Sequence, residues 1–145
     1  MLLILWPTVQ AAVYIEGPLT HEKIIEPGQS YSGTIKVRNS GKTMKEVKVF
    51  QRNYLFNAKG ESHYLPLYNK KGAARSNAKW ISFRPQILKV PPKSLASIRY
   101  VVRVPNSQSL KGTYWSVLMV QPISDSSPLS SKPKKRLEMK SKVLD

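Results

Sequence analysis

Apolar and polar residues alternate with a period of two in several short segments of this chain. The segments 31–38 and 97–104 show the alternation most clearly, because every second residue is apolar or glycine and most residues between are Ser, Thr, Lys or Arg. Such a pattern is typical of a β-strand with one buried and one solvated face. No stretch of helical length between residues 13 and 123 repeats with the helical period.

Turn-forming residues divide the region 13–123 into about seven strand candidates, spaced roughly 8–15 residues apart. The turns are rich in Gly, Pro and Asn, as at 26–29, 39–42, 57–60 and 91–92. Strands do not alternate with helices, which argues against a parallel α/β sheet. We therefore predict an all-β fold, an immunoglobulin-like antiparallel β-sandwich.

The stretch 109–123, SLKGTYWSVLMVQPI, is apolar on both faces. Its alternation places Trp115, Val117 and Met119 on one face, opposite the face that holds Leu118 and Val120. A strand of this kind is either a central strand covered on both sides or a strand with one apolar face used for docking. Trp115, Val117 and Met119 are therefore candidate partner-binding residues.

The chain carries a net charge of +16, and the tail from Ser124 accounts for only +3 of it. The remaining +13 belongs to the folded region, where Arg99 and Arg103 lie on the polar face of one predicted strand. With Lys36 or Arg38 across the sheet they would form a basic stripe, and we take Arg99 and Arg103 as candidate partner-binding residues. A basic surface attracts anionic polymers or lipids, although charge also serves solubility alone.

Residues 1–12, MLLILWPTVQAA, resemble the apolar core of a signal peptide with a small-residue cleavage pattern, although no Lys or Arg precedes them. The alternative is a buried first strand. Export would place the mature chain in the periplasm or another extracytoplasmic space, without a transmembrane segment, since the run is too short to span a bilayer.

Acidic residues are too scarce for most catalytic sites. No aspartate lies between residues 13 and 123, and three of the five glutamates there, Glu16, Glu22 and Glu26, cluster before the first clear strand, where an exposed polar loop is the favoured interpretation. Acid–base catalysis and oxygen-ligand metal sites depend on positioned carboxylates. The two histidines, His21 and His63, are far apart, and there is no cysteine or phosphate-binding loop. We expect no enzyme activity, cofactor or metal.

The basic loop 69–79 lies between Tyr68 and Trp80, and aromatic residues beside cations can stack bases and hold phosphates of a nucleic acid. It contains no recognised nucleic-acid-binding motif, and an exported protein rarely meets nucleic acid. A solvated loop is the favoured interpretation.

Three segments together resemble the N-terminal immunoglobulin-like domain of periplasmic pilus chaperones, the PapD-like superfamily. They are EPGQSYSGTIKVRNSG (26–41), WISFRPQILKVPPKSLASIRYVVRVP (80–105) and NSQSLKGTYWSVLMVQPI (106–123). The chain is also similar to related exported immunoglobulin-like domains of unknown role. The resemblance implies binding of an extended segment by β-augmentation. Chaperones of this kind hold a carboxylate with an Arg in the first strand, where this chain has only His21 and Lys23.

The Ser-, Pro- and Lys-rich tail, 124–145, does not have the pattern of the strand that should follow Ile123. We expect a basic, disordered tail and a sandwich that lacks its last strand. The tail could reflect a truncated or frameshifted gene, form a poor final strand, or leave a groove for a partner strand. The first of these is favoured.

The predicted function is a non-catalytic binding or assembly module of the bacterial cell envelope, acting through an exposed sheet edge and a basic face. Its partner would be an extended protein segment or an anionic envelope polymer. The alternatives are a structural module of a larger surface complex and a wall-polymer-binding domain.

Overall fold

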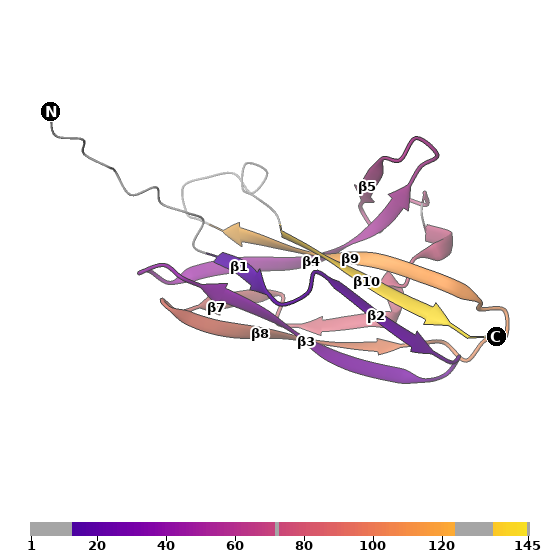
Figure 1. Ribbon diagram of the computed structural model, residues 1–145, viewed down its shortest axis with the longest axis horizontal. Helices are drawn as coiled ribbons and strands as arrows, with labels where there is room; N and C mark the ends of the chain where they lie inside the picture. Colours follow the sequence, from indigo (N-terminus) through magenta and orange to yellow (C-terminus); the bar gives the residue numbers. More distant parts are fainter. Residues whose placement is uncertain (1–12, 72, 124–134, 145) are drawn as a thin grey trace, which may run out of the picture.

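Two β-sheets pack face to face in the computed structural model, which describes residues 13–71, 73–123 and 135–144 (Figure 1). The strands are β1 (Val13–Glu16), β2 (Thr20–Ile25), β3 (Ser30–Asn39), β4 (Lys45–Phe56), β5 (Ser62–Leu65), β6 (Ile81–Arg84), β7 (Ile87–Val90), β8 (Ser94–Arg103), β9 (Gly112–Ile123) and β10 (Lys135–Val143). Two 3₁₀ turns, Ala73–Arg75 and Ala78–Trp80, lie between β5 and β6. The predicted all-β, immunoglobulin-like sandwich is confirmed.

The first sheet has the strand order β1-β3-β8-β6 and the second has β2-β10-β9-β4-β5, with β7 paired to β4. All described pairs are antiparallel except β2 with β10, which run parallel. The inward columns of β3 and β8 meet those of β4, β9 and β10 in one core. Its fully buried side chains include Ile35, Val37, Val47, Ile98, Val102, Leu118, Val120 and Leu137.

The N-terminal part of the described chain contributes one strand to each sheet. β1 pairs with residues 36–39 of β3, and the chain then crosses to the second sheet, where β2 pairs with β10. Gly17 has φ of +101° in this crossover and precedes Pro18. Glycine adopts that conformation without the steric penalty of a side chain. Residues 1–12 and their predicted signal peptide lie outside the described residues.

The expectation of a disordered tail and a missing last strand is wrong for residues 135–143. They form β10, which lies between β2 and β9 and pairs with both. Leu137, Met139 and Val143 face the core and are buried. The fourth inward position is Ser141, and this polar residue interrupts the apolar alternation that would have indicated a strand. The remaining linker, 124–134, lies outside the described residues.

The basic loop 69–79 is anchored to the core at its end and is only partly solvated. Asn77 and Ala78 are buried. The Asn77 side-chain amide donates to the Met139 carbonyl at 3.1 Å and to Ser141 Oγ at 3.1 Å, and its Oδ1 accepts from Ser116 Oγ at 2.6 Å. These bonds satisfy polar groups that would be costly to bury unpaired.

Leu137→Ala should lower the free energy of unfolding by about 2–5 kcal/mol, because it leaves a cavity in the core. Leu144→Ala is the matched control, since Leu144 follows β10 and is 43% exposed whereas Leu137 is 0% exposed. The control should cost no more than about 0.5 kcal/mol. Urea denaturation measures both, and equal costs would contradict the placement of β10 in the core.

Candidate functional site

Trp115, Val117 and Met119 share the outer face of the second sheet, but they do not form an exposed apolar surface. Val117 is 0% exposed, Met119 is 8% exposed and Trp115 is half-buried. Of the two interpretations of this strand, the one with an open apolar docking face does not fit Val117 and Met119. Their role in partner binding stays a prediction.

The cover of this face comes from the strands on both sides of β9. Met119 lies opposite Phe50 of β4 and Arg136 of β10. Long arginine side chains can lay their apolar stems over such a surface while the charged ends reach water. This outcome matches the first interpretation of SLKGTYWSVLMVQPI, a central strand covered on both faces.

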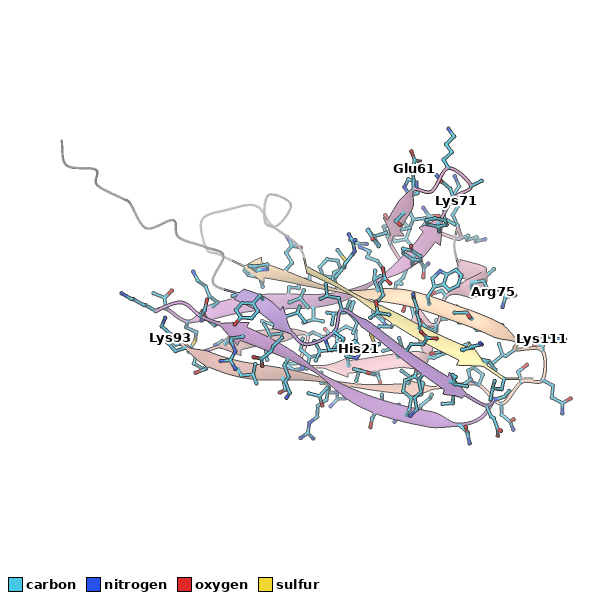
Figure 2. The ribbon with its side chains drawn as sticks, viewed as in Figure 1. His21, Glu61, Lys71, Arg75, Lys93 and Lys111 are labelled. Atoms are coloured by element: carbon cyan, nitrogen blue, oxygen red, sulfur yellow. The ribbon has the colours of Figure 1, made fainter. Side chains whose placement is uncertain are left out.

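The hairpin of β4 and β5 rises from the second sheet as an arm, with Glu61 near its end (Figure 2). The arm also covers Trp115, whose Nε1 donates to the Tyr54 carbonyl at 3.2 Å. The Trp115 and Tyr54 rings meet edge to face at 6.2 Å. The guanidinium of Arg136 lies 4.9 Å from the centre of the Tyr64 ring, a cation–π contact.

Arg99 and Arg103 lie on the outer face of the first sheet, as predicted, and both are exposed. Arg99 is directly opposite Thr34 of β3 on one side and Arg84 of β6 on the other. Arg103 is opposite Ser30, and its guanidinium donates to Ser82 Oγ of β6 at 3.4 Å.

Lys36 completes a group of four cations with Arg84, Arg99 and Arg103, which we call the basic face. Lys36 is opposite Ser97, two residues from Arg99 along β8. Arg38 is different, because its guanidinium donates to both oxygens of Glu16 at 3.0 and 3.5 Å. These hydrogen bonds, with the charge of Glu16, raise the pKa of Arg38.

An exposed sheet edge was predicted, but not its position in the first sheet: half of β3 has a described strand partner on one side only. β1 covers residues 36–39 of β3, whereas Ser30–Ile35 pair with β8 alone among the described strands. We call Ser30–Ile35 the open edge. β2 runs along the same side of the sandwich in the second sheet (Figure 1).

A hollow of about 290 Å³ lies between β2 and the open edge. Its lining comes from both sheets: Pro18, Thr20, His21, Glu22, Lys23, Tyr31, Ser32 and Tyr100. Two tyrosines bridge the sheets here. Tyr31 Oη shares a hydrogen bond with Ser141 Oγ at 2.5 Å, and Tyr100 Oη with His21 Nδ1 at 3.2 Å. Figure 2 shows His21 at this position on β2.

Burial raises the pKa of Tyr31, against the smaller opposing effect of its bond to Ser141. Burial, and then the neighbouring Tyr31, raises the pKa of Tyr100. Both side chains are therefore neutral phenols at physiological pH, and they contribute hydroxyl groups without charge to the lining of the hollow.

The histidines predicted as weak metal candidates serve other contacts. His21 Nε2 contacts the Pro18 carbonyl at 3.1 Å and its ring meets Tyr100 edge to face. His63 lies on β5 near Asn57 and Glu61. Within the described ranges, no group of three or more His, Asp or Glu side chains could hold a metal ion. No described helix has the length and apolar character needed to cross a membrane.

No family model and no curated protein matches the sequence. Solved structures show the same fold at low sequence identity. A PapD-like domain of human CEP192 has a TM-score of 0.63 at 13% identity, covering 98% of this chain and 94% of that domain. The fimbrial chaperone CfaA has a TM-score of 0.62 at 15% identity, covering 92% of this chain and 57% of the chaperone.

A family 123 glycoside hydrolase from Clostridium perfringens contains the fold too, with a TM-score of 0.60 at 11% identity, covering 90% of this chain and 23% of the hydrolase. The chain therefore spans nearly all of one solved neighbour, slightly over half of the chaperone and about a quarter of the hydrolase. At these identities the likeness shows the fold alone, and the fold is that of PapD-like domains.

Gly33→Ala should destabilise the protein by about 1–3 kcal/mol. Gly33 is opposite Tyr100, and a Cβ there would meet the Tyr100 ring. The ring would have to leave its place over β3 and its contact with His21. Urea denaturation of Gly33→Ala, Tyr100→Ala and the double variant measures the coupling. The cost of Gly33→Ala should shrink once Tyr100 is alanine, and an unchanged cost would rule out the clash.

Proposed function

We propose that this chain is a non-catalytic binding module that holds an extended segment of another protein at its open edge. The segment would pair with Ser30–Ile35 of β3 and extend the first sheet by one strand. The observation that carries the proposal is the single-sided pairing of these six residues. Backbone hydrogen bonds supply the affinity in such β-augmentation, and neighbouring side-chain sites supply the specificity.

The open edge lacks the features with which proteins protect free strands. Exposed edges are usually blunted by charged residues, proline or a bulge. Residues 30–35 read SYSGTI and contain neither charge nor proline. The neighbouring edge of β2, which has no partner among the described strands, carries Glu22 and Lys23 by contrast. β3 is therefore the better acceptor for an added strand.

The dimensions also suit a peptide. Six residues of strand extend about 20 Å. The hollow beside the open edge can take side chains that alternate inward from the added strand. The tyrosine hydroxyls of the hollow already have partners within the chain. The hollow therefore suits peptide side chains of modest size better than a reactive substrate.

An extracytoplasmic, chaperone-type or assembly role fits the same site. Two of the solved neighbours are chaperones in complexes with a tip adhesin or a tip adhesion subunit. The signal-peptide-like pattern of residues 1–12 supports export. We accordingly place the protein in the cell envelope, as a partner of extended protein segments.

Peptides of about ten residues selected from a displayed random library should bind at the open edge. Amide hydrogen exchange of the chain with each selected peptide is the measurement. Exchange should slow within Ser30–Ile35, at the alternate amides that point away from β8, and remain unchanged in β5 and β6. Failure to select any peptide, or protection confined to another surface, would refute the proposal.

A further inference from the structure

We infer that the segment held at the open edge is acidic, with its carboxylates on the side of the basic face. The inference rests on the proposed function and names the chemistry of its partner. Its basis is the arrangement of the cations on the first sheet and the small side chains between them and the open edge.

The basic face contains a pair of like charges in direct register. Arg84 and Arg99 are cross-strand partners, and both are exposed. Like charges directly opposite each other destabilise a sheet. An anion placed beside them would remove the repulsion, so the pair favours binding of negative charge.

The chain itself supplies little negative charge on this face. Glu61 is the only acidic residue between positions 47 and 123, and it lies on the arm of the second sheet. Glu16 of β1 is directly opposite Lys36, but its carboxylate is paired with Arg38. Among the residues that the structure describes, Lys36, Arg84 and Arg99 form no ion pair. The partner would provide the missing carboxylates.

The small side chains of β3 leave Arg99 a path to the open edge. On the outer face of that half of β3 the side chains are Ser30, Ser32 and Thr34. Thr34 separates Arg99 from the position of an added strand. An arginine side chain can extend over a threonine, and repulsion from Arg84 directs Arg99 that way. Lys36 lies on β3 itself, next to the end of the open edge.

The four cations of the basic face do not contribute equally. Arg103 leans toward β6, where it donates to Ser82 Oγ, so it is directed away from the open edge. Arg84 lies beyond β8 on β6. Lys36 and Arg99 are therefore the cations expected to contact the carboxylates of the bound segment.

The inward side of the bound segment would be uncharged. The hollow is lined by one acidic and one basic side chain, Glu22 and Lys23, whose charges cancel, and by the uncharged Tyr31 and Tyr100. Since side chains of a strand alternate between faces, the preferred partner has acidic residues at every second position and neutral residues between them.

Three synthetic peptides test the inference. Each alternates valine with one other residue, which is glutamate, glutamine or lysine. Fluorescence anisotropy gives the affinities, and amide exchange reports the site. The glutamate peptide should bind about tenfold tighter than the glutamine peptide at low salt, and the lysine peptide should bind most weakly. The preference should diminish as the salt concentration rises, because the cations are exposed.

The variant Lys36→Gln/Arg99→Gln should reduce the affinity for the glutamate peptide to that for the glutamine peptide. Lys59→Gln/Lys89→Gln is the matched control. It also removes two positive charges, from exposed positions on the arm and on β7. It should change the affinity by less than about twofold.

The outcomes separate this inference from the proposed function. If the glutamine peptide binds as tightly as the glutamate peptide and slows exchange within Ser30–Ile35, the acidic preference is wrong and the proposed function stands. If none of the three peptides slows exchange there, the proposed function fails as well. If inorganic polyphosphate displaces the glutamate peptide and itself slows no exchange at the open edge, the basic face binds polyanions generally and the inference is overturned.

Discussion

The structure depends on the insertion of β10 between β2 and β9. β10 is the only described strand that pairs with β2, and it supplies Leu137, Met139 and Val143 to the core. It also flanks β9 and helps to cover the outer face of that strand. Because β2 must lie beside β10, the chain leaves the first sheet after Glu16. The open edge of β3 is therefore a direct consequence of how the second sheet is completed.

Buried polar contacts fix the position of β10 along its neighbours. Ser141 is fully buried and bonds to Tyr31 of the first sheet and Asn77 of the loop before β6. A slip of one residue would bring Lys140 or Lys142 into this position, since strand side chains alternate between faces. The serine that weakens the apolar pattern of β10 thus selects its register.

The sequence predicts those elements whose residues alternate locally, and it predicts less where distant parts of the chain must meet. The alternation in 31–38 and 97–104 was sufficient to place β3 and β8 and to put Arg99 and Arg103 on a shared outer face. β10 was missed because Ser141 interrupts its inward column and a Ser- and Pro-rich stretch precedes it. The open edge depends on where the chain crosses between sheets, for which Gly17 and Pro18 were the only local signal.

The parallel pairing of β2 with β10 also affects how the protein can fold. Thr20 and Glu138 are register partners although 118 positions separate them along the chain. Folding slows as native contacts become more distant in sequence, so the pairing of β2 with β10 is expected to form late. Until β10 pairs, β9 is flanked by β4 alone, and β2 lacks its partner among the described strands. Closure of the sandwich is consequently a late folding event, and the chain would be prone to aggregation until β10 has docked.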